Sequence, residues 1–180
     1  MRQANLGWSM SASIGVGKLR LGVLVSGRGS NLLAIIHAIE SGALDAQIVL
    51  VLSNKIDAPA LERARQHGAQ SVFLDPKPFV HLPDKREAYD RAVLDLLTQN
   101  QVDLVLLAGY MRIVTSVLID PYKNRMMNIH PSLLPSFPGL DVQQKAIDWG
   151  CKLAGCTVHF VTEGVDEGPI IIQAAVPVLD

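Results

Sequence analysis

The sequence has few charges and no run of Lys or Arg. Only 18% of its 180 residues are charged, and the formal net charge at pH 7 is −1. Nucleic acids and membrane surfaces attract concentrated positive charge, so neither is an expected partner, although a local basic pocket for one phosphate stays compatible with this composition. The 49% hydrophobic content is ample for the core of one ordinary globular domain, and the expected partners are small molecules.

Cysteines and long apolar runs are also scarce. Cys151 and Cys156 have neither a second pair nor a His at zinc-site spacing, so we expect no metal site and no disulfide framework. No run of roughly 18 apolar residues occurs, which argues against a membrane span. Residues 1–18 lack a signal-peptide core and are expected to form a flexible leader. A transit peptide stays open because this segment has no acidic residue, but the simpler expectation is a cytoplasmic protein.

From Leu19 onward, apolar runs alternate with amphipathic stretches, a pattern typical of an α/β fold. The expected strands are Leu19–Val25, Ile48–Ser53, Ser71–Leu74, Val102–Ala108, Met126–Ile129, Thr157–Val161 and Ile170–Val178. The expected helices are Asn31–Ser41, Ala58–His67, Lys85–Asn100 and Val142–Trp149. Continuous apolar runs such as Val102–Ala108 suit strands buried on both faces. We therefore predict three layers: a mostly parallel twisted sheet with helices on both faces.

The stretch Asp75–Asp84 holds three prolines and is expected to be irregular, bordering a site as a mobile loop. Asp84 and Glu87 have the spacing of a capping box, in its Asp variant, at the start of the next helix. Both features delimit the helix that we expect over Lys85–Asn100.

Residues 128–135 read Asn-Ile-His-Pro-Ser-Leu-Leu-Pro and carry the strongest chemical signal. In an extended strand, Asn128 and His130 point to the same face, and the prolines then end the strand. A side-chain amide can donate to a developing oxyanion, and an imidazole can shuttle a proton, so the pair suits acyl-group chemistry. A hydrogen-bonded core histidine is the competing interpretation. The polar cluster over residues 162–169, between two apolar strands, favours the functional one.

A glycine turn, Ser26-Gly-Arg-Gly-Ser-Asn31, stands between the first expected strand and helix. Helix N-terminal amides and closely approaching backbone at such a turn can hold a phosphate. The turn is neither a dinucleotide-binding fingerprint nor a Walker loop, so NAD and ATP are poor candidates. A tight turn that needs glycine for conformation alone remains the alternative.

Together these motifs resemble the phosphoribosylglycinamide formyltransferase family. The resemblance spans residues 19–178 and is carried by Ser26–Asn31, Ala108–Ile113, Asn128–Leu140, Thr157–Val161 and Asp166–Gln173, in the family's order. The Phe-Pro-Gly-Leu sequence at 137–140 separates the chain from methionyl-tRNA formyltransferase, which resembles it around residues 128–135. The resemblance implies a formyltransferase-like, Rossmann-related domain over residues 19–180.

The resemblance also implies an activity: transfer of a formyl group from 10-formyltetrahydrofolate, as co-substrate, to the amine of glycinamide ribonucleotide in purine synthesis. It implies that His130 is the general acid/base, Asn128 polarises the formyl oxygen and Asp166 assists His130. Gly29, Ser30 and Asn31 match the phosphate-binding turn. The positions that match folate contacts are Arg86, Met111, Arg112, Ile113 and Val114, and no metal is implied.

Two departures from the family pattern leave alternatives open. Asp141 stands where relatives usually have a histidine, and the chain stops at Asp180, before the family's C-terminal helix. The shorter C-terminus favours a non-catalytic phosphate- or folate-binding module as one competing function, and a formyltetrahydrofolate hydrolase is the competing enzyme. The role of His159 and the choice between a monomer and a homodimer are also left open.

Overall fold

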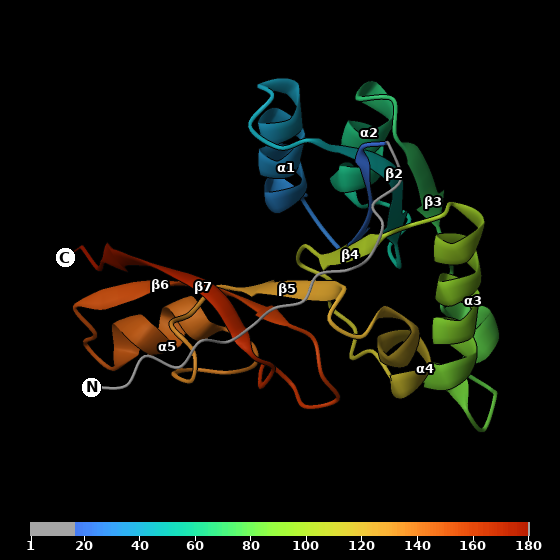
Figure 1. The fold of residues 1–180 in the computed structure, drawn as a ribbon. Coiled ribbons are helices and arrows are strands. Elements are labelled where there is room, and N and C mark those ends of the chain that lie inside the picture. Colours follow the sequence, from blue (N-terminus) through green and yellow to red (C-terminus); the bar gives the residue numbers. More distant parts are fainter. Residues whose placement is uncertain (1–16, 180) are drawn as a thin grey trace, which may run out of the picture.

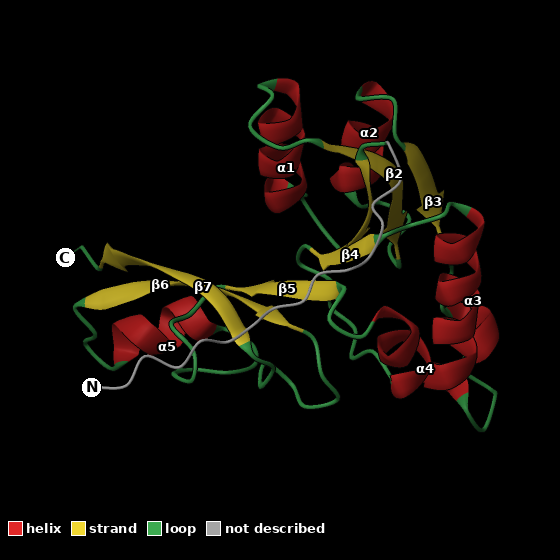
Figure 2. Ribbon diagram, viewed as in Figure 1, coloured by secondary structure: helices red, strands yellow, loops and turns green. Residues whose placement is uncertain are grey.

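The computed structural model describes residues 17–179, so the predicted leader lies outside the described residues except for Gly17 and Lys18. The strands are β1 (Leu19–Val25), β2 (Ala46–Ser53), β3 (Gln70–Phe73), β4 (Leu104–Leu107), β5 (Met126–His130), β6 (Leu153–Phe160) and β7 (Ile170–Pro177). The helices are α1 (Ser30–Glu40), α2 (Pro59–Gln66), α3 (Lys85–Gln99), α4 (Ser116–Ile119) and α5 (Val142–Asp148), with 3-10 turns η1 (Lys77–Phe79) and η2 (Asp120–Tyr122). Figures 1 and 2 show their arrangement.

The strands form one sheet in the order β3-β2-β1-β4-β5-β6-β7. The first five strands in this order, from β3 to β5, pair in parallel with one another, whereas β6 pairs antiparallel with both β5 and β7. This confirms the predicted α/β fold with a mostly parallel sheet. The chain winds outward from β1 through β2 to β3 and then returns to place β4 on the other side of β1. Ligands of doubly wound sheets bind beside such a reversal, at the carboxyl ends of the strands.

Helices cover both faces of the parallel part of the sheet, because its strands are apolar on both faces. On one face, Val23, Val25 and Val51 pack with Leu32 and Ile36 of α1 and with Ala60 and Ala64 of α2. On the other face, Leu24, Leu50, Leu52, Val105 and Leu107 pack with Tyr89, Val93 and Leu97 of α3 and with Leu118 of α4. In Figure 1, α1 and α2 accordingly lie together, apart from α3 and α4.

Several local predictions differ from the structure: β4 covers only Leu104–Leu107 of the expected Val102–Ala108, and α4 was not expected. β6 begins at Leu153 rather than at Thr157, because its pairing with β7 extends from Leu153 to His159. The predicted capping box is wrong: Asp84 precedes α3, but its side chain does not cap the helix. Its carboxylate instead accepts a hydrogen bond from Nη1 of Arg91, at 3.0 Å. The predicted irregular stretch 75–84 contains the short 3-10 turn η1.

Within the described residues, no helix has the length and apolarity needed to cross a bilayer. In the same part of the chain, no group of three or more His, Cys, Asp and Glu side chains is placed to hold a metal ion. Cys151 and Cys156 are both free thiols.

Candidate active site

Strand β5 and the loop between β6 and β7 bring three polar side chains together. Asn128 and His130 extend from the carboxyl half of β5, and Asp166 approaches from the loop. Oδ2 of Asp166 lies 3.3 Å from Nδ1 of His130, and its Oδ1 accepts a hydrogen bond from Nδ2 of Asn128 at 3.4 Å. The backbone amide of Gly139 also donates to Oδ2, at 2.9 Å. One carboxylate therefore contacts both candidate residues of the strand.

His130 lies between two oxygen acceptors and is only 4% exposed. Its Nδ1 faces Asp166, and its Nε2 lies 2.9 Å from the backbone oxygen of Phe137. A carbonyl and a carboxylate accept hydrogen bonds, so only the doubly protonated ring can donate to both. The carboxylate of Asp166 is thus placed to accept from a hydrogen on Nδ1, and the Phe137 carbonyl from one on Nε2.

His159, on β6, contacts the same cluster. It pairs across the sheet with Asn128, and its Nε2 lies 3.2 Å from Nδ2 of that residue. Its Nδ1 lies 2.9 Å from the backbone oxygen of Phe160, so Nδ1 carries the hydrogen and Nε2 accepts from Asn128. The same Nε2 lies 3.7 Å from Oδ1 of Asp166, so His159, whose role the sequence left open, contacts both Asn128 and Asp166.

A buried polar network holds the turn that follows β5. The hydroxyl of Thr157 donates to the backbone oxygen of Ser132 at 2.7 Å and accepts from the amide of Leu134 at 3.0 Å. The hydroxyl of Ser132 contacts the backbone oxygens of Ser136 and Phe137, at 2.6 Å and 3.1 Å. The network thus fixes the Phe137 carbonyl that faces His130. Because this contact comes from backbone, no residue type at position 137 could have predicted it.

The glycine turn lies at the carboxyl end of β1, where α1 begins. Gly29 precedes the helix with φ +75°, a conformation that favours glycine. A Cβ atom there would stand 2.7 Å from Cβ of Ala60, so the turn also needs glycine for its close contact with α2. Ser30 is exposed, and the first turn of α1 contains no acidic residue. Gly29, Ser30 and Asn31 therefore present helix N-terminal amides in a setting that suits an anion.

Residues 111–114 follow β4, at the same edge of the sheet. Met111 and Ile113 are 63% and 54% exposed, whereas Val114 is buried. The guanidinium of Arg112 stacks over the Tyr89 ring, 4.0 Å from its centroid. The segment thus offers apolar side chains to a ligand, while Arg112 is packed against α3.

Arg86, the remaining predicted cofactor residue, lies apart from these loops in the chain. It is exposed, in the first turn of α3. In contrast, three candidate groups lie at the carboxyl ends of neighbouring strands, because β4 pairs with both β1 and β5. These groups are the glycine turn, residues 111–114 and the cluster of Asn128, His130 and Asp166. The structure therefore gathers the other candidate residues at one sheet edge and leaves Arg86 on a separate helix.

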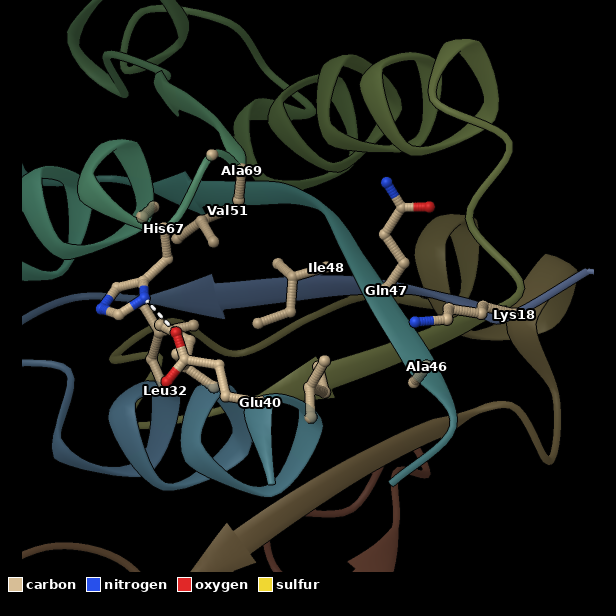
Figure 3. A pocket seen from close by; sticks show the side chains of 13 residues that line it. Lys18, Leu32, Glu40, Ala46, Gln47, Ile48, Val51, His67 and Ala69 are labelled. Atoms are coloured by element: carbon tan, nitrogen blue, oxygen red, sulfur yellow. Dashed lines mark hydrogen bonds and ion pairs between the residues drawn. The ribbon is translucent and has the colours of Figure 1, made fainter. Parts of the chain in front are cut away.

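A cavity of about 420 Å³ lies elsewhere, between α1, α2 and β2 (Figure 3). Ala46, Gln47 and Ile48, at the amino end of β2, line it, and none of the candidate site residues does. At one end of the cavity, Nδ1 of His67 lies 2.7 Å from Oε1 of Glu40. This cavity opens at the amino end of β2, so it does not form part of the candidate site.

This arrangement of fold and site is typical of α/β proteins that bind small ligands at the carboxyl edge of a parallel sheet, beside the reversal in strand order. The cluster of Asn128, His130 and Asp166 and the glycine turn both lie at this edge. The chain belongs to the formyl transferase family: the family described as formyl transferase matches residues 19–180.

Relatives and solved structures agree with this family. The chain is 46% identical over 156 residues to phosphoribosylglycinamide formyltransferase of Escherichia coli, covering 87% of this chain and 72% of that protein. It is 48% identical over 162 residues to the trifunctional purine biosynthetic protein adenosine-3 of Drosophila melanogaster, covering 89% of this chain and 12% of that protein. The structure of glycinamide ribonucleotide transformylase 1 from Symbiobacterium toebii superimposes with a TM-score of 0.86 at 50% identity, covering 91% and 75% of the two chains.

Proposed function

We propose that the chain transfers a formyl group from 10-formyltetrahydrofolate to the amine of glycinamide ribonucleotide, a step of de novo purine biosynthesis. The observation that carries this proposal is the contact of Asp166 with both Asn128 and His130, at the sheet edge that also holds the glycine turn. The names of the relatives from Escherichia coli and Symbiobacterium toebii support the same substrate.

The proposed reaction joins the amine nitrogen to the formyl carbon. The carbonyl oxygen gains negative charge as the carbon becomes tetrahedral, and the amide of Asn128 exchanges its 3.4 Å contact with Asp166 for a hydrogen bond to this oxygen. The amine nitrogen then loses a proton, N10 of the folate gains one, and the bond from N10 to the formyl carbon breaks. His130 moves this proton, and the negative charge of Asp166 stabilises its imidazolium.

The remaining predicted residues receive binding roles. Gly29, Ser30 and Asn31 hold the phosphate of the ribonucleotide through the amino end of α1. The formyl folate binds against residues 111–114, where Met111 and Ile113 expose apolar surface and Arg112 and Val114 support it. Arg86 binds the folate from α3. The reaction uses no metal, because the substrate supplies its own nucleophilic amine.

We also propose that the protein acts in the cytoplasm, as a monomer or homodimer, on these two small molecules rather than on nucleic acid or a membrane. The balanced net charge of −1 supports this assignment.

Transfer of an isotope-labelled formyl group tests the proposal. The chain is incubated with labelled 10-formyltetrahydrofolate, with or without glycinamide ribonucleotide, and the label is followed by mass spectrometry. The proposal expects label in the formylated ribonucleotide, only when the amine is present. Labelled formate formed equally without the amine would make the protein a hydrolase. Binding of both ligands with no product would make it a binding module.

A further inference from the structure

The hydroxyl of Ser26 joins the loops that follow three neighbouring strands. Ser26 comes directly after β1 and opens the glycine turn. Its Oγ donates to Oδ1 of Asn54, after β2, at 2.6 Å, and accepts from the amide of Met111, after β4, at 2.8 Å. Its own backbone amide donates to the oxygen of Gly109 at 3.0 Å. Both the donor and an acceptor site of this hydroxyl are therefore used.

The connected loops carry the proposed binding sites of the two substrates. Ser26 is the first residue of the glycine turn, and the segment with exposed Met111 and Ile113 begins at the amide that Ser26 binds. A shift of either loop would change the separation between the phosphate turn and the apolar segment. The hydrogen bonds of Ser26 to Asn54 and Met111 oppose such a shift of either loop.

We propose that Ser26 is a positioning residue that sets the geometry of the two substrate-binding loops relative to each other. This inference rests on the proposed function, in which an amine and a formyl carbon held by separate loops must meet. Reacting atoms need an approach of about 3 to 3.5 Å, and a misplacement of about 1 Å costs about a hundredfold in rate. Ser26 reaches neither reacting group, because its hydroxyl bonds go to Asn54 and Met111.

The other end of the apolar segment has a different anchor, which provides a contrast. Oδ2 of Asp90, on α3, accepts hydrogen bonds from the amide and the hydroxyl of Thr115, at 2.6 Å and 2.8 Å. This anchor joins the segment to a helix and leaves the glycine turn untouched. Loss of the Thr115 hydroxyl should therefore affect the folate alone, whereas loss of the Ser26 hydroxyl should affect both substrates.

Steady-state kinetics of four variants test the proposal, with KM measured for each substrate. Ser26→Ala is expected to lower kcat and to raise KM for both substrates, each about fivefold or more, and Ser26→Thr, which keeps the hydroxyl, is expected to restore these values. Thr115→Val is expected to raise KM only for the formyl folate. Ser41→Ala is the matched control, because it removes a serine hydroxyl that bonds to Ala38 at the far end of α1. The shape of the pH profile of kcat should not change in any variant.

Three results would overturn the inference while leaving the proposed function intact: a rise in KM for only one substrate in Ser26→Ala, no rise for either, or no recovery in Ser26→Thr. A change of Tm in Ser26→Ala without a rise in KM for either substrate counts as the second of these results. It would mean that Ser26 contributes to stability alone. If the unsubstituted chain neither binds nor formylates the ribonucleotide, the proposed function fails and the inference fails with it.

Discussion

Two oxygen acceptors contact the imidazole ring of His130. The residues that supply them, Phe137 and Asp166, both have positive φ, 53° and 57°. Such backbone conformations cost of order 1 kcal/mol or more each for non-glycine residues, so the surrounding contacts must stabilise them. The amide of Gly139 and the hydroxyl of Ser132 supply such contacts, through Asp166 and through the Phe137 carbonyl. The cluster is thus held in place before any ligand arrives.

Asp166→Asn tests the charge on this cluster without changing the size of the side chain. The amide removes the negative charge that stabilises the imidazolium of His130, so kcat for formyl transfer should fall about tenfold or more. Asp148→Asn is the matched control: Asp148 is exposed on α5, bonded to Gln144, and its variant should keep full activity. Equal activity of Asp166→Asn and the unsubstituted chain would remove the carboxylate from the mechanism.

Tyr110 presents a second residue-scale case, a buried hydroxyl that lies near the hydroxyl of Tyr89 but makes no well-formed hydrogen bond. Burial also raises the pKa of this hydroxyl far above its usual value. Tyr110→Phe removes the unpaired group, so the free energy of unfolding should stay level or rise by about 1 kcal/mol. Tyr122→Phe is the control, because its buried hydroxyl donates to the Val102 carbonyl at 3.3 Å and its loss should destabilise. Urea unfolding of both variants measures the difference, and a less stable Tyr110→Phe would contradict it.

At this scale the sequence predicts side chains better than it predicts their partners. The spacing of Asn128 and His130 placed them on one face of a strand, as β5 shows. The carbonyl of Phe137 and the amide of Gly139 could not be foreseen, because their positions depend on the path of a whole loop. The functional roles of Asn128, His130 and Asp166 remain predictions that kinetics must test.

At the scale of elements, the start of α1 depends on its packing against α2. Gly29→Ala combines two costs: a residue with a side chain at φ +75°, and a Cβ 2.7 Å from Cβ and 3.1 Å from Cα of Ala60. Gly42→Ala carries only the first cost, because its φ is also +75° but nothing lies within 4 Å. We expect Gly42→Ala to cost about 1 kcal/mol and Gly29→Ala clearly more, measured by chemical unfolding. Equal losses would show that α2 can move away freely.

The anchor between α3 and the segment after β4 predicts a pH dependence of stability. Burial raises the pKa of the Asp90 carboxyl above its ordinary value, although hydrogen bonds from Thr115 oppose the rise. The folded state therefore keeps this proton to a higher pH than the unfolded state. The free energy of unfolding consequently falls as the pH rises through the raised pKa, and below the ordinary pKa this penalty is absent.

Asp90→Asn removes this titration and can keep accepting from Thr115 through its amide oxygen. The stability of the variant relative to the unsubstituted chain should therefore grow as the pH rises from about 4 toward neutrality. Unfolding curves at a series of pH values measure this difference. A difference that stays constant, or that shrinks with rising pH, would contradict the raised pKa.

Helix and strand prediction succeeded where hydrophobic patterns are continuous and failed where tertiary pairing decides. The helix expected over Lys85–Asn100 appears as α3 within one residue at its end. Residues 153–156 of β6 contain a glycine, which weakens a strand signal, yet pairing with β7 extends β6 through them. Asp84 stands at the position of a helix cap, but its carboxylate binds Arg91 instead of the amides at the start of α3.

At the scale of the whole molecule, strand order explains why distant motifs meet. The glycine turn and the Asn128–His130 pair stand about a hundred residues apart in sequence, yet only β4 lies between β1, which precedes the turn, and β5, which carries the pair. Alternating apolar and amphipathic stretches predict a parallel sheet, but they do not give the order of its strands. The resemblance to a known family supplied the expectation that these motifs form one site.

The proposed formyl transfer is tested most directly by the absorbance change as 10-formyltetrahydrofolate loses its formyl group, recorded with and without glycinamide ribonucleotide. The same record is made for His130→Ala, whose folding is checked by circular dichroism. Turnover is expected to require the amine and to fall at least about a hundredfold in the variant. Turnover without the amine, or full activity of a folded His130→Ala protein, would contradict it.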